Sequence, residues 1–189
     1  MQNFIVQECQ TIADNFVKLK ELAPQLEKTV DICLDALKNG HKVMFCGNGG
    51  SASQAQHLAA ELVGRFRLNR PAMASIALTT DTSILTAVGN DYGFDKIFAR
   101  QVEGLGQTGD VLIGLSTSGN SMNVIKAFEL AKEKKITTIA FVGESGGKMA
   151  QMADVVLPFP ANTSHHIQNM HLAFGHVLCE LIEKKLYHE

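Results

Sequence analysis

The chain has 189 residues, of which 46% are hydrophobic, and a formal net charge of −2. This length and apolar content predict one globular domain with a sizeable core. The net negative charge disfavours a nucleic-acid-binding surface, which needs clustered Lys and Arg. No apolar run approaches the ~20 residues that span a bilayer, and the N-terminus has no signal-like apolar segment, so we expect a cytoplasmic protein without membrane partners.

The four cysteines, Cys9, Cys33, Cys46 and Cys179, lie far apart and form no CxxC pair. In an intracellular protein, such cysteines are expected to be small buried hydrophobes, not a disulfide framework or a thiolate zinc site.

Residues 3–38 carry apolar side chains at helical spacing, with a break at Pro24. This pattern predicts a helical hairpin in which Pro24 occupies the first turn of the second helix. Gly40 is expected to end that helix.

Five short apolar or β-branched runs follow, separated by segments of helical spacing: Val43–Cys46, Ser75–Thr79, Val111–Leu115, Thr137–Val142 and Val155–Phe159. This alternation predicts an α/β fold, a doubly wound five-stranded parallel sheet flanked by helices. Ligands of such sheets bind beyond the carboxyl ends of the strands. The loops after the first and third strands are therefore the places to search for a site.

The loop after the first strand is GNGGS, Gly47 to Ser51, and a helix follows at once. Converging N–H groups and the helix N-terminus favour an anion or a polyol oxygen there. The spacing through Ala52 also matches the G-x-G-x-x-A dinucleotide fingerprint, but Asp81 comes too late to be its acidic partner. A third possibility is that the glycines only permit a tight turn.

The loop after the third strand is STSGNS, Ser116 to Ser121, with four hydroxyls before a helix expected to start near Asn120. Hydroxyls, backbone N–H groups and a helix N-terminus favour phosphate binding without lysine. The GK[ST] of a P-loop is missing, so nucleotide hydrolysis is not indicated. An ordinary N-cap explains only one or two of these hydroxyls.

His57 and Glu61 are four residues apart on the expected helix after GNGGS, so their side chains share one face. They could hold an ion or a substrate together, or form an ordinary exposed His–Glu pair. The last helix, predicted from Ser164 to Leu186, is apolar on two sides and contains His165, His166, His171 and His176. Its two apolar sides predict packing against the sheet and against a partner subunit.

Four segments, CGNGGSASQAQHLAAEL, ALTTDTSILTAVGNDYGF, GDVLIGLSTSGNS and IQNMHLAFGH, occur in this order. Together they resemble the sugar isomerase (SIS) family, and within it the phosphoheptose isomerases, over nearly the whole chain. The resemblance implies a single SIS domain over residues 1–189, with residues 1–40 used in oligomerisation and residues 41–189 forming the α/β sandwich. It also implies a homotetramer with active sites at subunit interfaces and one Zn²⁺ per subunit. The implied reaction converts sedoheptulose 7-phosphate to D-glycero-D-manno-heptose 7-phosphate through an enediol, for lipopolysaccharide core heptose.

By position, the resemblance makes His57, Glu61, Gln168 and His176 the zinc ligands, with Glu61 and His176 as the proton-transfer pair. The implied substrate-binding residues are Asn48, Gly49, Gly50, Ser51, Glu61, Arg65, Asn90, Asp91, Ser116, Thr117, Ser118, Ser121 and Gln168. The family pattern Asp-Arg-Ile-Gln-Glu is replaced here by His165-His166-Ile167-Gln168-Asn169, which changes the expected support of the site.

Gln168 and His176 are eight residues apart, about 12 Å along a straight helix. If both bind one zinc ion, they are therefore expected to come from different chains.

The alternative function is a non-catalytic SIS tetramer that binds the replication initiator protein. As a family pattern, that protein lacks the glutamate and the final histidine, which are present here as Glu61 and His176.

Overall fold

The computed structural model describes residues 1–187. Its helices are α1 (Gln2–Lys18), α2 (Ala23–Lys38), α3 (Gly50–Val63), α4 (Thr82–Tyr92), α5 (Ala99–Leu105), α6 (Met122–Glu133) and α7 (Ser164–Tyr187). Its strands are β1 (Val43–Gly47), β2 (Ser75–Ala77), β3 (Val111–Ser116), β4 (Thr137–Gly143) and β5 (Val155–Phe159). Short 3-10 helices occupy Leu19–Leu22, Phe94–Lys96 and Met149–Gln151.

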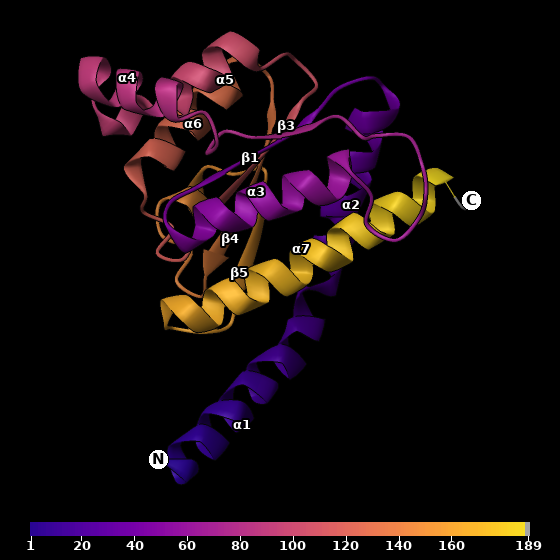
Figure 1. Ribbon diagram of the computed structural model, residues 1–189, viewed down its shortest axis with the longest axis vertical. Helices are drawn as coiled ribbons and strands as arrows, with labels where there is room; N and C mark the ends of the chain where they lie inside the picture. The colour runs from indigo at the N-terminus through magenta and orange to yellow at the C-terminus, as the bar shows by residue number, and fades with distance from the viewer. Residues whose placement is uncertain (188–189) are drawn as a thin grey trace.

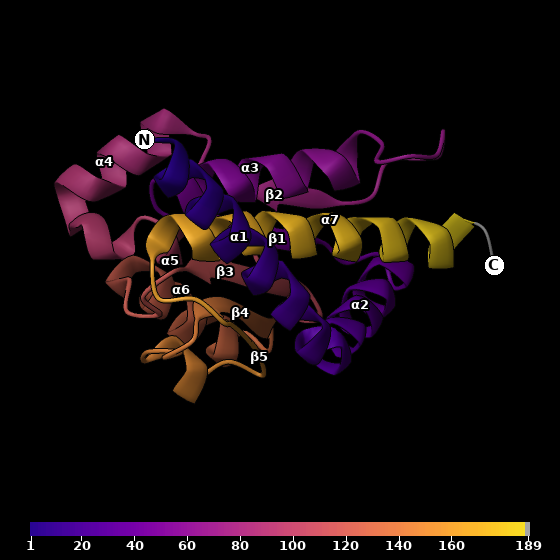
Figure 2. The same ribbon diagram turned by 90° about the horizontal axis from the view of Figure 1, so that it is seen from below.

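The five strands form one parallel sheet in the order β2-β1-β3-β4-β5. Helices α2, α3 and α7 cover one face, and α5 and α6 cover the other (Figures 1 and 2). Successive residues of a strand point to opposite faces, so Phe45 belongs to the first core and Met44 to the second. The predicted doubly wound fold is confirmed. The order reverses between β1 and β3, where such sheets bind ligands.

Most of the expected strand bounds agree with the structure to within one residue, but β2 is shorter than predicted because it ends at Ala77. Beyond it the chain turns, and Asp81 caps α4 by accepting a hydrogen bond from Ile84 N at 2.9 Å. Between residues 1 and 187, no helix is both long and apolar enough to cross a membrane.

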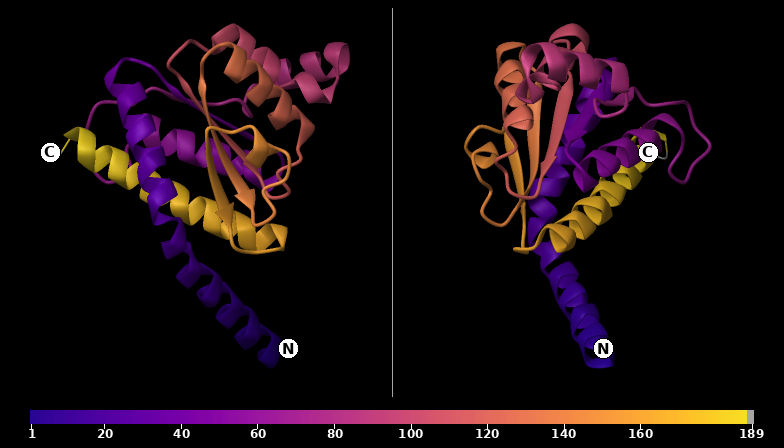
Figure 3. Two further views of the ribbon diagram at one scale, coloured as in Figure 1. Left: turned by 180° about the vertical axis from the view of Figure 1, so that it is seen from behind. Right: turned by 60° about the vertical axis from the view of Figure 1, so that its left-hand side comes forward.

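The N-terminal segment differs from the predicted hairpin. Lys18, Leu19 and Ala23 have right-handed helical dihedral angles, a 3-10 helix links α1 to α2, and α2 does not fold back along α1 (Figures 1 and 3). Pro24 is in the first turn of α2, as expected, where it starts a helix without turning the chain. The result is a bent, nearly continuous helix whose first part, α1, projects from the body (Figures 1 and 3).

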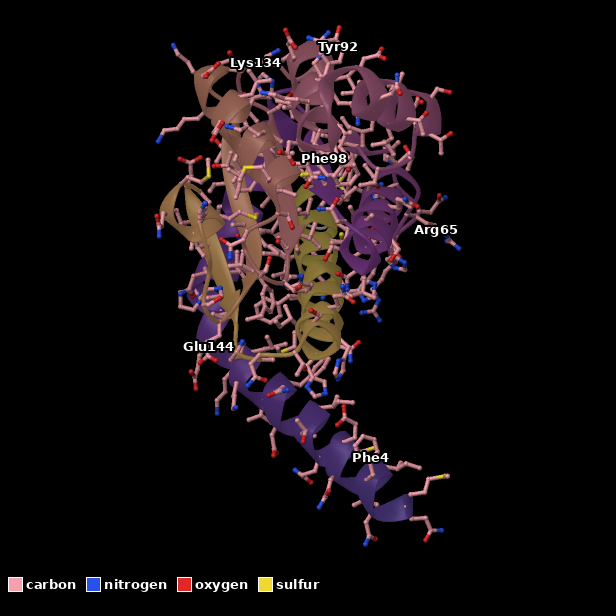
Figure 4. All side chains as sticks on the ribbon, turned by 90° about the vertical axis from the view of Figure 1, so that its left-hand side faces the viewer. Phe4, Arg65, Tyr92, Phe98, Lys134 and Glu144 are labelled. Carbon is pink, nitrogen blue, oxygen red and sulfur yellow. The ribbon has the colours of Figure 1, made fainter. Side chains whose placement is uncertain are left out.

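Because α1 projects from the body, the prediction that all four cysteines are buried is wrong for one of them. Cys33, Cys46 and Cys179 are buried, but Cys9 is exposed because it lies on α1. All four are free thiols. The apolar residues Phe4, Ile5, Val6 and Val17 of α1 are exposed for the same reason, and Figure 4 shows Phe4 pointing away from the body.

The carboxylate of Glu183 on α7 holds the loop that follows α3. It accepts hydrogen bonds from the backbone N–H groups of Phe66, Arg67 and Leu68, and it pairs with Arg70 Nε at 3.0 Å. The Arg70 and Glu183 side chains are only 2% and 1% exposed. Burial by itself would raise the pKa of Glu183, but the three N–H donors and Arg70 outweigh it, so the pKa lies below its ordinary value.

We predict that Glu183→Ala lowers the free energy of unfolding at pH 7 by about 3–5 kcal/mol, because it leaves Arg70 buried and unpaired. A group with a depressed pKa in the folded state stabilises above its unfolded pKa, so the difference from wild type should shrink as the pH falls below about 4.5. Urea unfolding at pH 7 and pH 4 measures both effects. Glu129→Ala, which removes an exposed carboxylate, is the control; an equal loss from it would contradict the prediction.

Candidate active site

Helices α3 and α7 lie side by side and parallel (Figure 1). Gln54 Nε2 donates to the Gln168 carbonyl at 2.5 Å, and farther along both helices Leu58 packs on Gly175. A side chain on residue 175 would collide with the Leu58 methyl groups, so only glycine permits this approach. His57 precedes Leu58 and His176 follows Gly175, so this contact brings the two histidines next to each other.

His57, Glu61 and His176 converge at this point. The Nε2 atoms of the two histidines are 3.0 Å apart, and Glu61 Oε1 lies 3.1 Å from His57 Nε2. The His57 side chain is 47% exposed and that of Glu61 23%, so solvent or a ligand can reach the group. Two imidazoles and a carboxylate with converging donor atoms match the ligands that Zn²⁺ takes in catalytic sites, and the donor set therefore fits the implied zinc.

Gln168 does not reach this group within the same chain. A Cβ on Gly50 would lie 2.6 Å from Gln168 Oε1, so the amide rests against the first turn of α3. Gly50 precedes His57 by seven residues, about 10 Å along the helix. The structure thus brings together three of the four predicted metal ligands and separates the fourth.

The β1 loop has the shape expected of an anion-binding turn. Gly49, with φ +56°, is the N-cap of α3, and Ser51 is buried in its first turn. Asn48 exchanges two 2.8 Å hydrogen bonds with the side chain of Asn123 on α6. Because Asp81 is used as the cap of α4, the loop lacks the acidic partner of a dinucleotide site.

The hydroxyls of the β3 loop contact one another and the start of α7 and do not cap α6. Ser121 is the N-cap of α6, which starts at Met122, yet its hydroxyl makes no capping bond and instead meets Ser116 Oγ at 2.8 Å. Thr117 Oγ1 lies 3.2 Å from Ser164 Oγ at the start of α7. Gly119 has φ +65° and packs directly on the Gly146 backbone, which fixes the loop.

A cleft of about 540 Å³ opens beside this loop. It is lined by Thr117, Ser118, Asn120, Gly143, Glu144, Ser145, Ala161, Asn162, Ser164 and Ile167. Glu144 points outward at its edge (Figure 4). The lining is therefore rich in neutral hydrogen-bonding groups and contains no cation.

Three predicted substrate residues lie elsewhere on the chain. Asn90 and Asp91 are exposed on the last turn of α4, where the Asn90 amide donates to Asp91 Oδ1 at 2.8 Å. In Figure 1, α3 lies between α4 and α7. Arg65 follows the end of α3 and points to the surface (Figure 4).

The histidines of α7 have different surroundings. His171 is fully buried against Phe141 and Phe159, and burial lowers its pKa to about 3. It is therefore a neutral core residue and not part of the exposed group. His176 instead faces His57 and the ring of Phe66, whose centroid is 5.7 Å away.

Comparison with known proteins identifies the family of this chain. Residues 7–143 match the family model described as the SIS domain. The phosphoheptose isomerase of Akkermansia muciniphila is 54% identical over 187 residues, which cover 99% of both chains. The chain belongs to the SIS domain family. Within it, the chain is grouped with the phosphoheptose isomerases.

Solved structures of the SIS family support the same grouping. The phosphoheptose isomerase from Neisseria gonorrhoeae superposes with a TM-score of 0.92 at 42% identity, covering 97% of this chain and 98% of that one. The one from Francisella tularensis gives 0.93 at 35% identity, with the same coverage.

Three side chains of this candidate site were not singled out from the sequence: Asn123, Phe66 and Ser164. Asn123 is an ordinary helix residue in the sequence, and only its pairing with Asn48 across the β1/β3 junction gives it a role. Phe66 and Ser164 matter because loops place them beside His176 and Thr117. Of the three, only Ser164 has a signal in the sequence, which is its place at the start of the predicted last helix.

We predict that Gly50→Ala impairs activity without lowering the thermal midpoint. The new methyl group would displace the Gln168 amide, while alanine favours the helix more than glycine does. A misplaced site residue should reduce kcat/KM for sedoheptulose 7-phosphate by about tenfold or more. Gly104→Ala on α5, where a methyl group meets nothing within 4 Å, is the matched control. Unchanged kinetics of Gly50→Ala would refute a role for Gln168.

Proposed function

We propose that this chain is an aldose–ketose isomerase that converts sedoheptulose 7-phosphate to D-glycero-D-manno-heptose 7-phosphate. The observation that carries the proposal is the convergence of His57, Glu61 and His176 in a chain that matches phosphoheptose isomerases along nearly its full length. The carboxylate and the imidazoles are the proton-transfer groups that such a reaction needs.

The reaction moves a carbonyl between C2 and C1. A base removes the proton from the carbon next to the carbonyl, an enediol forms, and a proton returns to the adjacent carbon. Glu61 and His176 are the pair that we assign to these steps. They project from different helices, so one can act on carbon while the other serves the oxygens.

His57, Glu61 and His176 would hold the zinc ion, together with Gln168. When bound there, zinc supplies a Lewis acid that polarises the substrate carbonyl. A carboxylate that is bound tightly to a metal is a poorer base, so Glu61 either alternates between the two roles or performs only one. His57 Nε2 lies 3.1 Å from Glu61 Oε1 and 3.0 Å from His176 Nε2, so the three groups face one point at which an ion could be held.

The phosphate group is assigned to the two loops at the β1/β3 junction. Ser116, Thr117, Ser118 and Ser121 supply hydroxyls, and α6 supplies the N–H groups of its first turn. Asn48, Gly49, Gly50 and Ser51 supply donors from the β1 loop for the sugar oxygens. Gln168 rests against this loop and is assigned to substrate as well as to metal.

We propose a homotetramer in which the active sites lie between subunits. Gln168 is separated from the His57 group within one chain, so a second copy would bring its own Gln168 to that group. Arg65, Asn90 and Asp91 are exposed and free to complete a neighbour's site in the same way. The apolar arm of α1 and a groove lined by Leu26, Phe174, Val177 and Leu181 offer surfaces for assembly through residues 1–40 and α7.

In the cell, we propose that the product supplies heptose for the lipopolysaccharide core and that the enzyme works in the cytoplasm. The alternative, a non-catalytic tetramer bound to the replication initiator protein, is not favoured. Glu61 and His176 are both present and both project into the same group.

The first test is a coupled assay with sedoheptulose 7-phosphate on wild type and Glu61→Gln, with zinc measured in the same samples. Loss of the carboxylate should lower kcat by about a hundredfold to ten-thousandfold and reduce the zinc content. Glu129→Gln, which replaces an exposed carboxylate on α6, should leave both kcat and the zinc content unchanged. A wild-type protein that assembles fully but is inactive would favour the binding-module function.

The second test addresses the shared site by mixing two inactive variants, Gln168→Ala and His176→Ala, under conditions that exchange subunits. If Gln168 serves the neighbouring chain, the mixture contains some complete sites, about a quarter of the total for random pairing. Recovery of activity and bound zinc is therefore expected. A mixture that stays inactive despite exchange, or a fully active monomeric variant, would show that each chain builds its own site.

A further inference from the structure

A second group of possible metal ligands lies where α1 meets the start of α7. Glu8 Oε1 is 2.6 Å from His166 Nε2 and 3.5 Å from His165 Nε2. The three ligand atoms all lie within 4.8 Å of one another. His165 precedes His176 by eleven residues, about 16 Å along α7, so this group is separate from the one assigned to the isomerase reaction.

The orientation of the two histidines is unusual for neighbours in a helix. Consecutive residues of an α-helix point about 100° apart, which normally separates their side chains. Here both rings turn toward the same carboxylate, and their centroids are 4.2 Å apart. The carboxylate comes from α1, more than 150 residues away in the sequence.

We propose that Glu8, His165 and His166 bind a divalent transition-metal ion that fastens α1 to the first turn of α7. Two imidazoles and one carboxylate suit Zn²⁺ and the neighbouring first-row metals, whereas Mg²⁺ and Ca²⁺ prefer oxygen ligands. His166 is 9% exposed, Glu8 34% and His165 66%, so the group is anchored on one side and open on the other. The open side leaves room for water to complete the coordination.

An ion bound by Glu8, His165 and His166 would link α1 to the body of the protein. Within one chain, α1 buries only Asn15, so few other contacts of the same chain hold it to the body. A metal at Glu8 would fix the arm against α7 beside Gln168, two residues beyond His166. The bound ion would therefore restrict the motion of both the arm and the first turn of α7.

The test uses the full chain carrying His57→Ala and Glu61→Gln, which silences the other group, freed of metal with a chelator and titrated calorimetrically with Zn²⁺. We expect one Zn²⁺ per chain, and binding more than about tenfold weaker after either Glu8→Gln or His165→Ala is added. His165 is mostly exposed, so its replacement should not disturb folding, which circular dichroism verifies. Cys9→Ser, which removes the exposed neighbouring thiol, should leave the affinity unchanged.

A second measurement works on the otherwise unaltered chain. Zn²⁺ should slow backbone hydrogen exchange over residues 2–18 in wild type but not in Glu8→Gln. The proposal is overturned if the silenced chain binds no Zn²⁺, since Glu8 and His166 would then form only a hydrogen-bonded pair. It is equally overturned if affinity survives Glu8→Gln and His165→Ala, or is lost in Cys9→Ser alone.

Discussion

The packing of Leu58 on Gly175 sets the distance between α3 and α7, and the rest of the site depends on that distance. Leu58 is fully buried, so its position is fixed by the core and not by the surface around it. His57 and His176 each lie one residue from this contact and emerge together at its edge. Core packing thus fixes the helix positions from which these two histidines project.

The parts of this arrangement that follow from local pattern were predictable. Apolar runs and glycines mark the strands and the turns after them, and the spacing of His57 and Glu61 places both on one helical face. The hydroxyls of the β3 loop could be singled out as candidate phosphate ligands, because capping alone does not account for four of them. These features depend on a few neighbouring residues, so a single sequence contains the information.

Other parts depend on contacts between distant segments, which one sequence does not reveal. The partnership of Asn48 with Asn123 and the position of Gln168 against Gly50 arise from how the strands are ordered. The direction of α1 is a similar case. A break at Pro24 is compatible with a hairpin and with a bent continuous helix, and the packing of Leu19, Leu22 and Leu26 against the body decides between them.

The cleft beside the β3 loop has no Lys or Arg in its lining. An anion held there would be bound by short, directed contacts from hydroxyl and N–H groups and not by a long-range field. Such contacts are screened far less by dissolved salt than the attraction between exposed charges is. Recognition at this loop would consequently depend less on ionic strength than attraction between exposed charges does, and the shape of the anion would contribute to selectivity together with its charge.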